Sequence, residues 1–158
     1  MASKTKTILE ALQDEIEGSA TLSYIETVFV VQSPNAAYLP ETFPNPPFVL
    51  IYPLQHEFQR MCIPSEGFHE VKYQIGLSYF QEYYDADKGM LGDGGDMVGA
   101  TEAELDFQSV LDNNTMSISG LVDAWFKSVS YSPISFGQAI EFSLAQFHAT
   151  LEYYAIGD

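Results

Sequence analysis

Residues 71–79 alternate between apolar and polar side chains, and this pattern constrains the fold more than any other part of the chain. The apolar positions are Val71, Tyr73, Ile75, Leu77 and Tyr79, and the polar or small positions between them are Lys72, Gln74, Gly76 and Ser78. Successive side chains of a β-strand point to opposite faces, so this spacing predicts a strand with one face toward the core. We expect it to run from Phe68 to Tyr83.

Other segments also have the composition of strands. Aromatic and β-branched residues predict strands at residues 24–31, 48–54 and 121–131. Pro53 has no backbone N–H to donate, and it therefore indicates an edge or the end of its strand. A last strand is expected from Ile140 to Tyr153, where the apolar positions move by one residue near Ala145. This change of phase predicts a β-bulge at Ala145.

Apolar residues at helical spacing predict two helices, at residues 5–17 and 98–111. Gly18 is expected to end the first helix, and Asn113 with Asn114 the second. The order of elements is helix, three strands, helix and two strands. It predicts an α+β fold with a mainly antiparallel sheet of about five strands and two helices packed on one face. A length of 158 residues fits a single domain over residues 1–158.

A Pro-rich segment at residues 32–47 separates the first two expected strands. Seven of the eight prolines lie between Pro34 and Pro64, so we expect this segment to be a stiff, extended arm. Tyr38, Leu39 and Phe43 are apolar residues on the arm. They are candidate contacts with a partner or a second copy, because a stiff segment loses little entropy on binding.

A Gly-rich acidic loop is expected at residues 84–97. Its aspartates form the densest charge cluster of the chain: Asp85, Asp87, Asp93 and Asp96. The segment from Asp85 to Gly89 begins like a calcium-binding loop, but the third ligand, the turn glycine and the closing glutamate of such a loop are missing. A solvated loop without a bound metal is the preferred interpretation.

The chain combines a formal charge of -16 with a composition that is 46% hydrophobic and 14% aromatic. This apolar content is enough for a core and excludes a disordered acidic tail. The cations are spread along the sequence, at Lys4, Lys6, Arg60, Lys72, Lys88 and Lys127, so no basic segment is available to bind phosphates. We expect a folded, soluble protein that repels DNA, RNA and anionic membranes.

The sequence contains no recognisable catalytic motif, and we expect neither an enzyme nor a cofactor. His56, Cys62 and His69 do not match the spacing of a standard zinc site. The lone Cys62 forms no internal disulfide, and the N-terminal residues lack the continuous apolar stretch of a signal peptide. No run approaches the roughly 20 apolar residues of a membrane helix. These features indicate synthesis in a reducing cytoplasm.

Adjacent aromatic residues occur within several expected strands. The pairs are Tyr79–Phe80, Tyr83–Tyr84, Trp125–Phe126 and Tyr153–Tyr154. Because neighbours in a strand point to opposite faces, both faces of the sheet should carry aromatic side chains. If two helices cover one face, either a second copy of the chain or the chain's own loops must cover the other.

The order of these segments resembles that of the tail terminator and tail-completion proteins of long-tailed bacteriophages. The resemblance covers a leading amphipathic helix, the approach LPETFPNPPFVLIYPL, the long strand HEVKYQIGLSYFQEY, the helix ATEAELDFQSVLDNN and the segment TMSISGLVDAWFKSVSYSP before a closing strand. It spans nearly the whole chain and is one of pattern and element order, without a diagnostic motif.

Membership of this family implies a homo-oligomeric ring, usually a hexamer, that caps the tail tube and joins it to the neck. The expected partners are further copies of the chain, the tail-tube protein and the neck or connector (stopper) protein, and the expected location is the virion. Genome DNA would pass through the lumen without specific binding, because a polyanionic wall supplies no affinity for phosphates. The aspartates of the loop at residues 84–97 would then face the lumen or a neighbouring subunit.

Other interpretations are compatible with the same residues. The chain could form a different ring of the phage neck or tail. It could also be a stand-alone acidic binding domain, or a protein of a salt-loving host whose charge serves solubility. An enzyme is the least favoured, because no pair of a nucleophile and a base is visible in the sequence.

Overall fold

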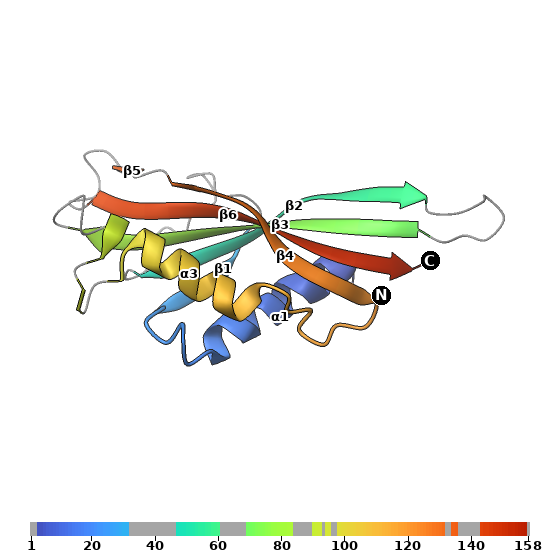
Figure 1. Ribbon diagram of the computed structural model, residues 1–158, viewed down its shortest axis with the longest axis horizontal. Coiled ribbons are helices and arrows are strands. Elements are labelled where there is room, and N and C mark those ends of the chain that lie inside the picture. Colours follow the sequence, from blue (N-terminus) through green and yellow to red (C-terminus); the bar gives the residue numbers. More distant parts are fainter. Residues whose placement is uncertain are drawn as a thin grey trace.

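The computed structural model describes residues 3–31, 47–60, 69–83, 90–92, 94–95, 98–131, 134–135 and 143–157. These residues form an α+β fold in which one twisted sheet lies against two helices. Helix α1 (Lys4–Gly18) and helix α3 (Ala100–Leu111) lie on the same side of the sheet (Figure 1). The predicted arrangement of two helices on one face is therefore confirmed.

The sheet is mixed. Its strands are β1 (Thr27–Val30), β2 (Phe48–Arg60), β3 (His69–Tyr83), β4 (Leu121–Tyr131), the two-residue β5 (Ile134–Ser135) and β6 (Ser143–Gly157). The order is β1-β2-β3-β6-β4, with β5 paired to the start of β6. Strand β1 is parallel to β2, and the other pairings are antiparallel. The prediction of a mainly antiparallel sheet is confirmed, and the parallel pair is an addition to it.

The main core lies between the sheet and the two helices. On β3, the alternating residues Ile75, Leu77 and Tyr79 are fully buried, which confirms the pattern read from the sequence. Helix α1 contributes its buried stripe of Ile8, Leu9, Leu12 and Ile16, and α3 contributes Ala100, Ala103, Phe107 and Leu111. The aromatic rings of Tyr79, Phe107 and Phe147 contact one another at centroid distances of 5.5 to 6.2 Å.

Local hydrogen bonds set the ends of the helices. The Ser3 hydroxyl accepts the Lys6 backbone N–H at the start of α1, and the Glu102 carboxylate accepts the Gly99 N–H at the start of α3. Gly18 is the last residue of α1, but Ser19 follows it with extended backbone. The predicted end of the helix at Gly18 is therefore confirmed, but no left-handed residue forms the cap. Helix α3 ends at Leu111, just before the predicted Asn113 and Asn114, and Asn113 has a positive φ of 58°.

Strand β2 continues beyond Leu54, where the sequence predicts that it ends. An extra residue on β2 between Pro53 and Gln55 shifts its register with β3, and the pairing then continues to Arg60. Pro53 lies beyond the four residues of β2 that pair with β1, so its missing N–H falls where that side of β2 has no neighbour among the described strands. The predicted end is wrong because a bulge, not a termination, accommodates this segment.

The predicted bulge at Ala145 is also wrong. Strand β6 pairs with β3 in unbroken register from Ser143 to Gly157. The extra residues of the β4–β6 pairing lie on β4 instead, at Val122 and Lys127. Since β6 is hydrogen-bonded on both sides, a bulge there would disturb two ladders, whereas β4 is an edge strand with one ladder.

The second face of the sheet, opposite the helices, carries a smaller apolar cluster at the β1 end. Phe48, Leu50, Tyr52 and Phe80 are all buried there, and the rings of Phe48 and Phe80 stack at 4.7 Å. Aromatic residues therefore occupy both faces, as the adjacent pairs predict. Because this cluster is buried within a single chain, it gives no argument for a second copy.

Candidate assembly surface

The bulge on β2 determines which side chains after Leu54 lie on the face of the sheet that packs against the helices. Before the bulge, Val49 and Ile51 face the helices and are fully buried. After it, His56 pairs with Tyr73 and Phe58 pairs with Val71, so these residues continue the helix-side face. Strands β2 and β3 extend past both helices in Figure 1, and this end of the sheet has no helix over it. The bulge thus puts His56 and Phe58 on an uncovered surface.

We call the helix-side surface of Pro53, His56, Phe58 and Tyr73 the uncovered face. Phe58 is 68% exposed, the largest value among the large hydrophobic residues that the structure describes. The His56 ring contacts Phe58 edge-on at 5.2 Å and Tyr73 at 5.8 Å. The three rings therefore form one aromatic group in contact with solvent.

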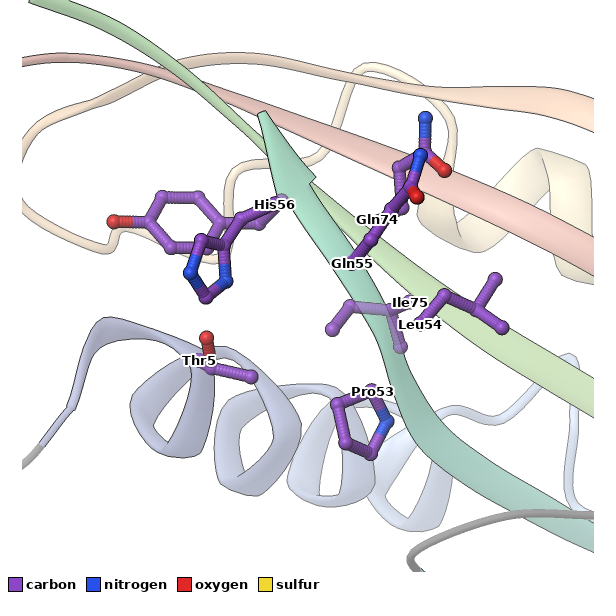
Figure 2. A pocket seen from close by; sticks show the side chains of 8 residues that line it. Thr5, Pro53, Leu54, Gln55, His56, Gln74 and Ile75 are labelled. Atoms are coloured by element: carbon purple, nitrogen blue, oxygen red, sulfur yellow. The ribbon is translucent and has the colours of Figure 1, made fainter. Parts of the chain in front are cut away.

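Two small cavities border the uncovered face. The first, of about 150 Å³, lies between the first turn of α1 and the bulge of β2. Figure 2 shows His56 and Pro53 on the α1 side of β2, with Thr5 of α1 below His56, whereas Gln55 and Gln74 point to the second face. The second cavity, of about 290 Å³, has Lys4, Val71, Tyr73 and Ile156 among its walls. Both lie below the usual volume of a site for a drug-sized ligand, about 300–1,000 Å³, and fit single side chains better.

Charge is distributed unevenly between the two ends of the molecule. Lys4 and Lys6 begin α1 and Arg60 ends β2, at the end of the sheet that extends past the helices. Lys72 on β3 lies at the same end but alternates with Tyr73, so it points to the second face, where it pairs with Glu70. The helix layer toward the other end is acidic, with Asp14, Glu15 and Glu17 late in α1 and Glu102, Glu104 and Asp106 in α3. Four of the six cations that are scattered in the sequence thus lie toward one end in space, together with the carboxylates of Glu57 and Glu70. Lys127 lies near the middle, and Lys88 lies outside the described residues.

On the second face, a chain of hydrogen bonds joins three strands. The Tyr52 hydroxyl lies 3.0 Å from Ser78 Oγ, which lies 2.6 Å from His148 Nδ1. A hydroxyl beside a histidine is a requirement of nucleophilic catalysis, but Ser78 is fully buried and out of reach of a substrate. Burial lowers the pKa of His148, which favours the neutral ring. We interpret the chain as a structural polar contact.

Further along the second face, a carboxylate is held by two partners. Gln74 Nε2 donates to Glu152 Oε2 at 3.1 Å, and Lys127 Nζ lies 3.4 Å from the same oxygen. Glu152 is 4% exposed, and these contacts compensate its burial. No sequence motif indicates either polar group, because their partners meet only through the register of β3, β4 and β6.

The structure does not place the candidate residues from the sequence. Tyr38, Leu39 and Phe43 of the predicted arm, and Asp85, Asp87, Asp93 and Asp96 of the predicted loop, lie outside the described residues. Cys62 does as well. Within the described ranges, no group of three or more His, Cys, Asp or Glu side chains is placed to hold a metal ion.

No protein-family model and no curated protein sequence matches this chain. No helix within the described ranges is long and apolar enough to cross a membrane.

Proposed function

We propose that this chain is a structural virion protein that forms a ring at the head-proximal end of a phage tail, where it caps the tail tube and joins it to the neck. The observation that carries the proposal is the uncovered end of the sheet. Phe58 is 68% exposed beside His56 and Tyr73, on strands that extend past the helices. A monomeric protein has no evident use for an exposed aromatic group at its projecting end, whereas a subunit of an assembly does.

The two ends of the molecule differ in a way that suits head-to-tail contacts. One end combines exposed aromatic rings with Lys4 and Lys6 of α1, and the helix layer toward the other end carries acidic residues. A ring requires one surface of each subunit to meet a different surface of the next. Unlike surfaces of opposite charge favour this kind of contact over a symmetric pairing of like ends.

The strong negative charge is compatible with DNA passing through the ring. A formal charge of -16 per subunit gives the assembled wall no net affinity for phosphates. The same charge opposes assembly, because neighbouring subunits repel one another. We therefore expect rings to form more readily as salt screens this repulsion, or on the tail tube as a template.

The competing function is a stand-alone acidic binding domain, and a ring elsewhere in the phage neck or tail is a variant of the main proposal. A stand-alone domain would stay monomeric at every salt concentration. A protein that forms a ring elsewhere in the neck or tail would assemble into the ring but would not bind the end of the tail tube.

The test is the mass of the purified protein, measured by native mass spectrometry alone and after mixing with the tail-tube protein encoded by the same virus. We expect a closed oligomer, six copies by the family resemblance, that binds the tube. Immunogold labelling of virions should then mark the junction of head and tail. A protein that is monomeric in both mixtures and absent from virions contradicts the proposal.

A further inference from the structure

A second exposed aromatic group lies on the other face of the sheet, where β4 pairs with β6. A shallow pocket of about 260 Å³ is lined there by Val122, Asp123, Trp125 and Tyr154. Extra residues on β4 at Val122 and Lys127 bracket this stretch, and within it Asp123 pairs with Tyr154 and Trp125 pairs with Glu152. The pairings place the side chains of Asp123, Trp125 and Tyr154 on one face.

The two rings form a wedge and not a closed stack. The centroids of Trp125 and Tyr154 are 6.0 Å apart, with the ring planes at 35°. Both side chains are only partly buried. Interaction with Glu70 on β3 raises the pKa of Tyr154 to about 12, so the phenol stays neutral. Part of the area of both aromatic faces is open to solvent.

The charges around the wedge leave one carboxylate for an incoming cation. Lys127 lies 3.4 Å from Glu152, and Lys72 lies 3.9 Å from Glu70, so both lysines have acidic neighbours of their own. Asp123 is exposed at the rim and takes part in none of the ion pairs found among the described residues. Its Oδ1 accepts the Ala124 N–H at 2.8 Å, which fixes the carboxylate beside the rings.

From this arrangement we infer that the Trp125–Tyr154 pocket binds an arginine side chain of a partner protein with a basic surface. The face of an indole or phenol ring attracts a cation, and a guanidinium is flat enough to lie on Trp125 while its N–H groups reach Asp123. A basic partner is the chemistry that a chain of charge -16 attracts. The chain has a single arginine, Arg60, at the end of β2, and strands β3 and β6 separate β2 from β4, so the chain's own arginine does not fill the pocket. A second copy of the same charge would be repelled, which favours a different protein as the partner.

Trp125 is the only tryptophan of the chain, so its fluorescence reports on the pocket alone. The probe is the peptide Ac-Gly-Arg-Gly-NH2, titrated against the folded protein at low salt. The control probe carries citrulline, which has the shape of arginine without the charge. We expect a saturable change in Trp125 fluorescence with arginine and binding at least about tenfold weaker with citrulline, a difference of about 1.4 kcal/mol. Lysine should bind more weakly than arginine, because it lacks the flat surface.

Two variants test the residues. Asp123→Asn should weaken the binding of the arginine peptide by about threefold to tenfold, because the substitution keeps the shape of the side chain and removes its charge. Glu17→Gln, an exposed position on α1 on the other side of the sheet, is the matched control and should leave binding unchanged. Circular dichroism checks that both variants are folded.

Several results would overturn the inference. Equal binding of the arginine and citrulline peptides, no effect of Asp123→Asn, or no saturable signal at millimolar peptide would each do so. A fluorescence change that depends on protein concentration alone, and that Arg60→Gln abolishes, would identify a second copy as the occupant in place of a basic partner. The measurement uses the folded single chain, so it stands whether or not the protein forms a ring.

Discussion

Strand β2 pairs with β3 along its whole length, but the side chains of the two strands are buried at one end and exposed at the other. At the end covered by the helices, Val49, Ile51 and Tyr79 are fully buried, and at the projecting end Phe58 is 68% exposed. The composition of the strands does not explain the difference, since both ends carry aromatic residues. What differs is the presence of helices, and the comparison shows that one half of the sheet provides stability while the other presents a surface.

The largest expected effect compares one phenylalanine from each half. Phe107→Ala should lower the free energy of unfolding by about 3–5 kcal/mol, because the ring is fully buried between Tyr79 and Phe147. Phe58→Ala should change it by no more than about 0.5 kcal/mol. Urea denaturation followed by circular dichroism measures both. A large loss for Phe58→Ala would mean that the projecting half belongs to the core, and the comparison would fail.

The second prediction concerns two glycines. A Cβ added at Gly76 would lie 2.0 Å from the Tyr52 ring, which packs over this position on the second face. Gly76→Ala should therefore cost about 1–3 kcal/mol of stability through overpacking. Gly18→Ala, at the end of α1 with nothing within 4 Å, should be neutral or stabilise by up to about 1 kcal/mol. Thermal unfolding of the two variants distinguishes them, and equal effects would contradict the close packing of Tyr52 on Gly76.

The sequence predicts the covered half of the molecule better than the projecting half. Ile75, Leu77 and Tyr79 were assigned correctly to the core because a buried face imposes strict alternation on a strand. Strand 121–131 and helix 98–111 were also located to within two residues, since their periodicity is local.

The errors have a common physical cause. A bulge at Leu54 reverses the faces of all later residues on β2, and only the pairing with β3 reveals it. The aromatic group of His56, Phe58 and Tyr73, and the wedge of Trp125 and Tyr154, arise from cross-strand register that no single segment encodes. The candidate residues of the arm and the loop stay predictions, because they lie outside the described part of the chain.

A third prediction compares two buried tyrosine hydroxyls. The Tyr52 hydroxyl lies 3.0 Å from Ser78 Oγ, whereas the Tyr153 hydroxyl is buried without a hydrogen-bond partner among the described residues. Tyr52→Phe should cost about 1 kcal/mol, and Tyr153→Phe should be neutral or stabilising. Denaturant midpoints of the two variants test this. A destabilised Tyr153→Phe protein would show that its hydroxyl has a partner after all.

The smallest expected effect is a dependence on pH. Burial lowers the pKa of His148 below its usual value in the folded protein, so the unfolded state binds the proton more readily. The neutral ring therefore contributes stability above the unfolded pKa of about 6.5, and this stability is lost as the pH falls through the folded pKa. His148→Asn should reduce the loss of stability between neutral and mildly acidic pH. An unchanged pH profile would exclude His148 as its source.

The most direct test of the central claim is native mass spectrometry of the wild type, Phe58→Ser and Val30→Ser in the presence of the tail-tube protein. Val30, 44% exposed on β1, serves as the matched control because it is an exposed apolar residue away from the projecting end. We expect that the wild type and Val30→Ser assemble into the same closed oligomer, and that Phe58→Ser stays monomeric while its unfolding curve is unchanged. Normal assembly of folded Phe58→Ser would contradict the claim that the uncovered half of the sheet is a subunit contact.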